Sequence, residues 1–278
     1  WLAMALLYIK EQNVEYIVLE TGLGGAKDST NGLSVPPMVC AITSIGLEHT
    51  QYLGDTISLI AAEKAGIIKP KVPVVIGKMP ADARDVIINR CKQLESEYIL
   101  ADEVSYNKPL GLFGKYQRNN AAVAVEIVKL LDIDIPTHTI DQGLANAVWE
   151  GRMQIISKSP FIMVDGAHNP SGVKALYDSL IAEFSNQQFS FIMAVMADKD
   201  YLEMAHIIAP VARRIFTVTV SSERGLQANA LAAAIEDIGI NATCYDSYET
   251  AINAAKVFSE PIIVFGSLYF IGEILGGL

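Results

Sequence analysis

The chain has 278 residues, of which 51% are hydrophobic and 19% are charged, and its formal net charge is -10. Its length predicts about two domains, and its high hydrophobic fraction excludes an intrinsically disordered protein. No cluster of Lys and Arg interrupts the acidic balance, so we expect no binding to nucleic acid. Cys40, Cys91 and Cys244 are odd in number and lack metal-ligand spacing, which predicts a reducing, cytoplasmic setting.

Two apolar stretches are not predicted to cross a membrane. The run over residues 1–9 is too short for a span, and it lacks the basic start and cleavage site of a signal peptide. The stretch from Pro261 to Leu278 has Glu273 as its only charge, but four glycines interrupt it. We expect a buried strand, a turn and a short helix there, and therefore no membrane partner.

The first half of the chain is predicted to alternate strands with helices. The expected elements are a buried helix at 1–10, strands at 16–19 and 39–45, a helix at 56–65, a strand at 72–76, a helix at 82–95, a strand at 98–100 and a helix at 119–131. Such alternation is typical of parallel βαβ units. Turn formers at 132–138 and a break at 149–152 then predict a domain boundary near residue 150.

The second half of the chain repeats the alternation with greater regularity. Strands are expected at 161–164, 189–195, 214–219, 242–245 and 262–265, and helices at 171–184, 201–209, 228–238 and 248–258. The fold class predicted from both halves is α/β, with two doubly wound domains over residues 1–150 and 151–278.

Polar residues follow several of the predicted strands. Glu20, His49 and Asp165 each come at or just after a strand end, where open parallel sheets bind their ligands. A carboxylate and an imidazole could meet there at one Mg²⁺ ion, which needs only one or two protein ligands in a phosphate site. From spacing alone we favour the alternative in which Glu20 caps a turn and His49 packs under a loop.

Three further features are compatible with chemistry or with ordinary structure. The loop Gly22-Leu23-Gly24-Gly25 could bring amides to an anion, or form a plain turn. Lys64 lies in an apolar helix that would leave its amine neutral and reactive, or it pairs with Glu63. His168 lies between a strand and a helix. A phosphate loop, G-x-x-x-x-G-K-[ST], is absent from the sequence, because both Gly-Lys pairs are followed by other residues.

Taken together, the motifs resemble those of folylpolyglutamate synthases and dihydrofolate synthases. Residues 20–31 resemble the segment E-x-G-L-G-G-R-x-D-[AS]-T-N, residues 43–50 resemble T-S-I-x-x-D-H-T, and residues 63–69 match E-K-A-G-I-x-K. Gly151-Arg152, residues 165–170, residues 196–200 and residues 266–269 match signatures of the second half. The matches keep the family's order and cover nearly the whole chain.

The resemblance implies a fold and a reaction. The family belongs to the Mur ligase group, with a central ATP-binding α/β domain followed by a Rossmann-like domain. The implied enzyme is an ATP-dependent ligase that phosphorylates a folate or pteroate carboxylate and joins it to the α-amine of L-glutamate. The implied partners are these small molecules alone, with a monomeric, cytoplasmic protein and ATP and Mg²⁺, in two sites, as cofactors.

The resemblance also implies roles for single residues. Glu20 and His49 match Mg²⁺ ligands, and Lys64 matches a carbamylated lysine that helps to hold the second metal; these three are the implied catalytic residues. The residues that match nucleotide-contacting positions, at an ATP site between the two domains, are Asn120, Arg152, Asp165 and His168. Lys27, Asp28 and Ser29 match part of the pterin site.

Two departures from the family pattern affect the expected function. Ala26 stands where the family usually has Arg, and the family's phosphate loop upstream of Glu20 is missing. We therefore expect part of a longer protein, inactive by itself as a ligase. The alternatives are a catalytically inactive nucleotide- or folate-binding remnant and a Mur-type ligase of cell-wall precursors.

Overall fold

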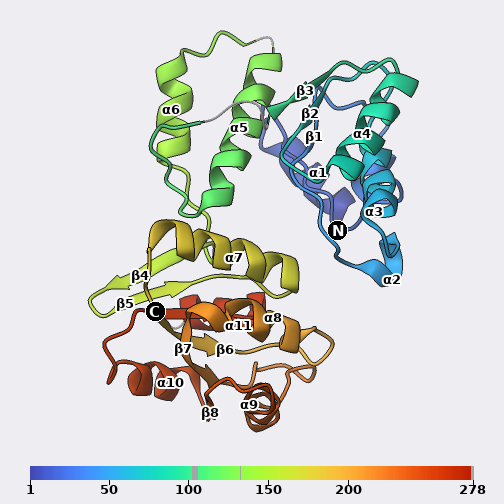
Figure 1. Ribbon diagram of the computed structural model, residues 1–278. Helices are drawn as coiled ribbons and strands as arrows, with labels where there is room; N and C mark the ends of the chain where they lie inside the picture. Colours follow the sequence, from blue (N-terminus) through green and yellow to red (C-terminus); the bar gives the residue numbers. More distant parts are fainter. Residues whose placement is uncertain (102–105, 132, 277–278) are drawn as a thin grey trace. The chain divides into compact units, whose positions relative to one another are not determined.

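The computed structural model describes residues 1–101, 106–131 and 133–276, and it divides into two compact units (Figure 1). Unit 1 comprises Trp1–Tyr106 and Asn119–Ile135, and unit 2 comprises Asn107–Arg118 and Pro136–Leu278. Unit 2 thus includes residues 107–118 and 136–150, which the sequence analysis placed in the first domain. The predicted domain division at residue 150 stays a prediction.

Unit 1 is built on a small parallel sheet. Its strands β1 (Cys40–Ile42), β2 (Val74–Ile76) and β3 (Tyr98–Leu100) lie in the order β1-β2-β3, with Cys40 opposite Val74 and Val74 opposite Tyr98. All of β2 is buried, as expected of the central strand of a parallel sheet. The predicted strands at 39–45, 72–76 and 98–100 are confirmed, the first two being shorter than expected.

Helices with recognisable end signals cover this sheet. Helix α3 (Ile57–Lys64) is capped by Thr56, whose hydroxyl oxygen accepts the N–H of Leu59 at 3.3 Å. It packs against α4 (Ala81–Gln93), and both contribute to the core around β1 and β2. The remaining helical elements of this part are α2 (Thr50–Leu53), the 3-10 turns η1 (Ser29–Gly32) and η2 (Ala65–Ile67), and α5 (Lys115–Leu130), which extends from unit 2 into unit 1.

The predictions for the first twenty residues are partly wrong. Helix α1 (Leu2–Glu11) forms, but none of its residues is buried. The predicted strand at 16–19 is not a strand, and Val18 is 98% exposed. A β-branched run becomes a strand only where a neighbouring strand offers its N–H and C=O groups, and the described sheet of unit 1 pairs only β1, β2 and β3. Glu20 therefore does not follow a strand.

Unit 2 contains a six-stranded sheet in the order β4-β5-β9-β6-β7-β8. Its strands are β4 (Gln154–Lys158), β5 (Phe161–Val164), β6 (Phe189–Met193), β7 (Ala212–Thr217), β8 (Ala242–Cys244) and β9 (Ile262–Phe265). Only the β4–β5 pair is antiparallel; the other neighbours run parallel. The last strand, β9, lies between β5 and β6, so the order of strands along the chain reverses there. Doubly wound sheets bind their ligands at such switch points.

Both faces of this sheet are buried. In β6, Phe189, Phe191 and Met193 belong to one core cluster and Ile192 to the other, because successive side chains of a strand point to opposite faces. Helices α7 (Pro170–Glu183), α8 (Tyr201–Ile208) and α9 (Ala228–Asp237) contribute to the first cluster. Helices α10 (Tyr248–Ala255) and α11 (Leu268–Gly276) contribute to the second. Unit 2 is therefore doubly wound.

The elements predicted for residues 161–265 are confirmed to within a few residues. The strand and short helix expected after Pro261 are β9 and α11, and no helix in the described part of the chain has the length and apolar character of a membrane span. The sequence analysis missed β4 and α6 (Thr137–Ala145). Helix α6 carries Thr, Asp and Gly residues that imitate a loop, and none of its residues is buried.

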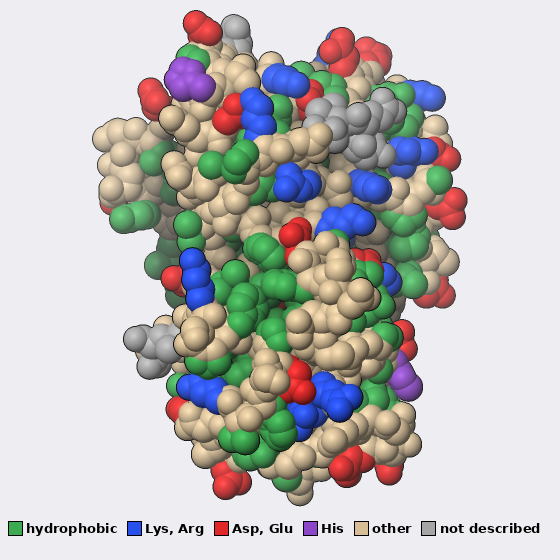
Figure 2. Space-filling model, turned by 60° about the vertical axis from the view of Figure 1, so that its left-hand side comes forward, with side chains coloured by type: hydrophobic (Ala, Val, Ile, Leu, Met, Phe, Trp, Pro, Cys, Tyr) green, Lys and Arg blue, Asp and Glu red, His purple; other side chains and the backbone are tan. Residues whose placement is uncertain are grey.

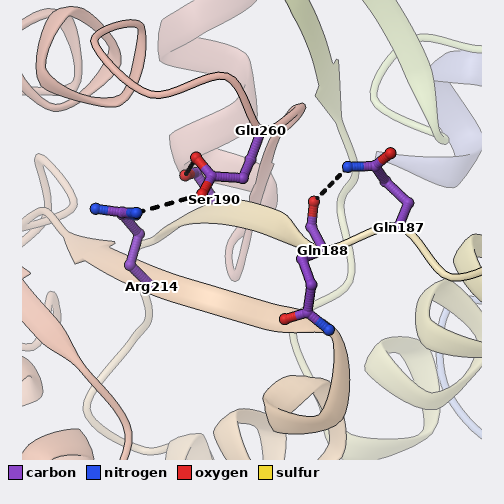
Figure 3. A network of polar contacts seen from close by, with 5 residues as sticks. All are labelled: Gln187, Gln188, Ser190, Arg214 and Glu260. Atoms are coloured by element: carbon purple, nitrogen blue, oxygen red, sulfur yellow. Dashed lines mark hydrogen bonds and ion pairs between the residues drawn. The ribbon is translucent and has the colours of Figure 1, made fainter.

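A polar network ties together the starts of three strands of unit 2 (Figure 3). Nη2 of Arg214, in β7, lies 3.2 Å from Oε1 of Glu260, which precedes β9, and the Ser190 hydroxyl donates to Oε2 of Glu260 at 3.5 Å. The Arg214 guanidinium carbon lies 3.3 Å from the centre of the Phe258 ring. Nearby, the Gln187 amide donates to the Gln188 carbonyl. The network lies at the amino ends of β6, β7 and β9.

Candidate functional site

Asp165 occupies the turn after β5 and joins two backbone segments. It is 3% exposed. Its Oδ2 accepts the N–H of Met153 at 2.9 Å, and its Oδ1 accepts the N–H of Ala167 at 2.8 Å. The carboxylate therefore fixes the turn at 151–153, which carries Arg152, against the turn at 165–168, which carries His168. This places three of the predicted nucleotide residues in one part of unit 2.

The turn around Arg152 has an unusual backbone. Gly151 and Met153 have φ values of 69° and 43°, in the left-handed region. Gly151 adopts such a value at little cost, whereas Met153 is held there by its bond to Asp165. The carbonyl of Gly151 also accepts the N–H of Gly166 at 2.7 Å. Arg152 thus projects from a segment whose backbone is fixed on both sides.

Burial dominates the electrostatics of Asp165. It raises the pKa of this carboxyl, while the two backbone N–H groups and the charges of Arg152 and His168 act in the opposite direction. Tyr116, near the start of α5, lies in the same environment. Burial raises the pKa of Tyr116 to about 12, with a further contribution from the Asp165 charge. Sequence reasoning missed Tyr116, because its interaction with Asp165 joins segments that lie far apart in the chain.

His168 has one ring nitrogen engaged and one available. Its Nδ1 lies 2.8 Å from the carbonyl oxygen of Gly166. A carbonyl only accepts, so we assign the hydrogen to Nδ1 and leave Nε2 for another partner. Helix α7 begins directly afterwards, where the Asn169 side chain accepts the N–H of Gly172 at 2.7 Å and Pro170 takes the first helical position. The helix expected over 171–184 therefore begins one residue earlier than predicted, with Asn169 as its cap.

In unit 1, Asp28 organises the glycine-rich loop. Its Oδ2 accepts the N–H groups of Gly22 and Leu23 at 3.0 and 3.1 Å. Its Oδ1 accepts the N–H of Thr30 at 2.9 Å and the Thr30 hydroxyl at 2.6 Å. The hydrogen bonds, that from the Thr30 hydroxyl first, lower the pKa of Asp28 below its usual 3.8. The loop is therefore at least an ordered turn held by this carboxylate.

The same loop is seated on the end of α3. The Ala26 N–H donates to the Glu63 carbonyl at 2.9 Å, and the Asn31 side chain donates to the Gly66 carbonyl at 3.1 Å. A Cβ at Gly25 would lie 2.8 Å from the carbonyl oxygens of Glu63 and Lys64, so this position requires glycine. Two of the three predicted pterin-site residues, Lys27 and Ser29, are exposed. In the third, Asp28, both carboxylate oxygens accept hydrogen bonds from within the loop.

The predicted metal residues are placed as follows. Glu20 and His49 are exposed, and His49 precedes α2 with a left-handed φ of 50°. Nζ of Lys64 lies 3.4 Å from Oε1 of Glu48, rather than pairing with Glu63. Among the residues that the structure describes, no hydrogen bond or ion pair links Glu20, His49 and Lys64 to one another. The same described residues contain no group of three His, Cys, Asp or Glu side chains arranged for a metal. Convergence of Glu20, His49 and Lys64 on one ion stays a prediction.

Asn120, the fourth predicted nucleotide residue, lies in α5 within the part of that helix assigned to unit 1. Its side chain is exposed. On the face drawn in Figure 2, Lys and Arg side chains are interspersed with Asp and Glu side chains.

Comparisons with known proteins cover nearly the whole chain. Residues 151–268 match the Mur ligase glutamate ligase domain. Folylpolyglutamate synthase from Lacticaseibacillus casei is 32% identical over 99% of this chain and 70% of its own length. Dihydrofolate synthase/folylpolyglutamate synthase from Bacillus subtilis is 32% identical over 98% of this chain and 70% of its own length. The chain belongs to the folylpolyglutamate synthase and dihydrofolate synthase family.

Solved structures of this family share the fold. Mycobacterium tuberculosis folylpolyglutamate synthase, complexed with ADP and AMPPCP, gives a TM-score of 0.89 at 26% identity, covering 99% of this chain and 71% of that one. Escherichia coli FolC in complex with DHPP and ADP gives a TM-score of 0.85 at 25% identity, covering 98% of this chain and 68% of that one. The resemblance and the Mur-ligase-type α/β fold expected from the motifs are thereby confirmed. The matched glutamate ligase domain contains Arg152, Asp165 and His168.

Proposed function

We propose that this folylpolyglutamate synthase family member is an ATP-dependent amide ligase that adds L-glutamate to folate or pteroate. The terminal phosphoryl group of ATP passes to a substrate carboxylate, which gives an acyl phosphate and ADP. The α-amine of glutamate attacks the acyl carbon, the C–N bond forms, and phosphate leaves as the amine loses its proton. The observation that carries the proposal is the buried Asp165 carboxylate, which fixes the Arg152 and His168 turns within a matched glutamate ligase domain.

Within unit 2, each residue of this cluster has a distinct task. The Arg152 guanidinium offers a planar fork for phosphate oxygens. Asp165 holds the two turns through its backbone contacts, and its remaining lone pairs can accept a nucleoside hydroxyl. His168 presents Nε2, because Nδ1 is engaged by the Gly166 carbonyl. Asn120, in unit 1, is proposed as a further nucleotide contact from its family match.

The residues proposed for Mg²⁺ have suitable donor atoms. Glu20 offers a carboxylate and His49 an imidazole, and Mg²⁺ in phosphate sites needs only one or two protein ligands beside water and phosphate oxygens. When bound, Mg²⁺ would neutralise charge on the phosphates. Lys64 is proposed to carry a carbamate that holds a second ion. Capture of CO₂ requires a neutral amine, so the ion pair between Lys64 and Glu48 has to open first.

The substrate side of the proposal rests on the loop at 22–31. Lys27 and Ser29 are exposed beside the turn that Asp28 maintains, and they are proposed to contact the pterin ring. Asp28 is proposed to act by holding this loop. Ala26, in place of the family's usual Arg, removes one cation from that surface.

We propose that these 278 residues do not catalyse the ligase reaction by themselves. They contain no Walker A lysine, and phosphoryl transfer depends almost entirely on positioning and on neutralising phosphate charge. The absence also favours a second candidate function, a nucleotide-binding protein without ligase activity. The three free cysteines support a cytoplasmic setting. A monomer is proposed from the resemblance to the family.

The test is glutamate-dependent release of ADP in the presence of tetrahydrofolate or dihydropteroate. It is run on the 278-residue chain and on a protein that carries a Walker A loop ahead of the same residues. The expected result is turnover by the longer protein, dependent on both glutamate and the folate or pteroate, and none by the shorter. Nucleotide binding without turnover in the longer protein would establish the second candidate. Equal turnover by both proteins would refute the role given to the missing loop.

A further inference from the structure

The indole of Trp149 is exposed at a position where the backbone is fixed. Trp149 lies between α6 and β4, and it is 62% exposed beside Val148, which is 80% exposed. Among the residues that the structure describes, its ring contacts no other aromatic ring and no Lys or Arg side chain. A large apolar ring kept in water at an ordered position is a feature of binding sites.

Hydrogen bonds fix the chain on both sides of this residue. Before it, Asn146 closes α6 with its N–H bonded to the Gln142 carbonyl at 2.9 Å, and the Leu144 carbonyl accepts the N–H of Gly111 at 2.9 Å. After it, the Gly151 N–H donates to Oε1 of Gln154 at 2.8 Å, and the Gly151 carbonyl accepts the N–H of Gly166. The indole therefore projects from a short segment anchored at each end.

The nearest positive charge that follows this ring in the sequence limits what can bind it. Arg152 follows three residues later, within about 10 Å along the chain, and it is fixed by the contact between Met153 and Asp165. A ligand that satisfies both residues has a planar ring at one end and an anionic group at the other. A purine nucleotide has this form, with its base and phosphates separated by a ribose.

We propose that Trp149 stacks on the purine base of the nucleotide whose phosphates Arg152 binds. The inference rests on the proposed function, because the nucleotide is the one that the ligase reaction consumes. Trp149 is a binding residue that positions the base, and it takes no part in transfer of the phosphoryl group. Since every base has an aromatic face, stacking on an indole gives affinity with little selectivity among bases.

The experiment uses the chain's two tryptophans. Trp1 is 99% exposed, so Trp1→Phe leaves Trp149 as the sole indole without disturbing packing. This variant is titrated with ADP while the fluorescence of Trp149 is recorded, and binding is measured independently by calorimetry. Trp149→Ala, Trp149→Phe and the matched control Val148→Ala are measured by calorimetry and by thermal unfolding.

The expected result is quenching of Trp149 by ADP with the same Kd that calorimetry gives. Trp149→Ala should weaken ADP binding roughly tenfold, the size of one lost base stack, with Tm unchanged because the indole is exposed. Trp149→Phe and Val148→Ala should bind ADP almost as well as the parent.

Two contrary results separate the inference from the function on which it rests. Unaltered ADP affinity in Trp149→Ala, with no quenching in the single-tryptophan protein, would overturn the stacking role and leave the proposed function standing. Absence of ADP binding to every variant by calorimetry would overturn the nucleotide site itself, and the stacking role with it.

Discussion

Oδ2 of Asp165 accepts the backbone N–H of Met153 at 2.9 Å, across 12 residues of chain. Met153 takes a left-handed φ of 43° to make this contact, and Arg152 lies directly before it. An acidic residue expected to contact a nucleoside therefore has a second role, which is to hold an arginine in place. Removal of the carboxylate should accordingly affect both stability and nucleotide binding.

Asp165→Asn tests this double role. An asparagine can accept one of the two backbone N–H groups, but its amide nitrogen then faces the other N–H as a second donor. We expect a loss of about 1–3 kcal/mol in the free energy of unfolding, the usual cost of an unsatisfied buried group, and weaker ADP binding. Urea denaturation and calorimetry give the two values. Asp237→Asn, at an exposed position in α9, is the matched control and should change neither. A variant as stable as the parent would contradict the bridging role.

Asp28→Asn tests the glycine-rich loop through its pH dependence. Hydrogen bonds lower the folded-state pKa of Asp28 below 3.8, so its stabilising effect is present above that pH and is lost as pH falls through the folded-state pKa. Asp28 is half-buried at the surface, so solvent weakens the effect, and we expect a loss of roughly 1 kcal/mol or less at pH 7, or about 2–4 °C in Tm.

The measurement for Asp28 is thermal unfolding of the parent and the variant from pH 7 down to pH 3. The difference in Tm should shrink as the pH falls and the parent's carboxylate takes up its proton. Asp85→Asn, exposed in α4, controls for the loss of one negative charge. A Tm difference that is constant over the whole range would show that the carboxylate charge is not what holds the loop.

Sequence reasoning predicted unit 2 well because its strands are continuous apolar runs bounded by turn formers. Strands β5 and β9 have the predicted bounds, since a strand buried on both faces needs no partner information to be recognised. The segment at 16–19 has the same composition, yet it forms no strand. Whether such a run becomes a strand depends on a neighbouring strand that local sequence does not reveal.

In the candidate site, too, some features were predicted from the sequence and others were not. The resemblance to the family indicated Arg152, Asp165 and His168, and Asp165 was also noted because it follows a predicted strand. The contacts of Asp165 with backbone N–H groups, the proximity of Tyr116, and the pairing of Lys64 with Glu48 depend on segments far apart in the chain. Spacing carries no information about them.

Arg214→Lys tests the network at the amino ends of the strands in unit 2. Lysine keeps the charge but loses the planar group that lies on the Phe258 ring and reaches Glu260. We expect a loss of about 1–3 kcal/mol in the free energy of unfolding. ADP binding should be unchanged, because Asp165 lies beyond the carboxyl end of β5 and the network lies at the amino ends of the strands. Arg213→Lys, the exposed neighbour on the same strand, should be neutral. Equal stability of the two variants would show that the stacking contributes nothing measurable.

Arg152 has two possible roles, and two substitutions separate them. It faces phosphate in the proposed function, and it also offsets the charge of the buried Asp165. Arg152→Ala removes both effects, so it should weaken ADP binding roughly tenfold to a hundredfold, the worth of one charge-assisted contact, and also lower Tm. Arg152→Lys keeps the positive charge near Asp165 but cannot form a two-pronged contact with phosphate. We therefore expect it to restore most of the Tm while ADP binding stays weak. In the longer, Walker A-bearing protein, Arg152→Ala should raise the KM for ATP and lower kcat. Unchanged nucleotide affinity in both variants, with a lowered Tm in Arg152→Ala alone, would assign Arg152 to structure and leave unit 2 without its proposed phosphate contact.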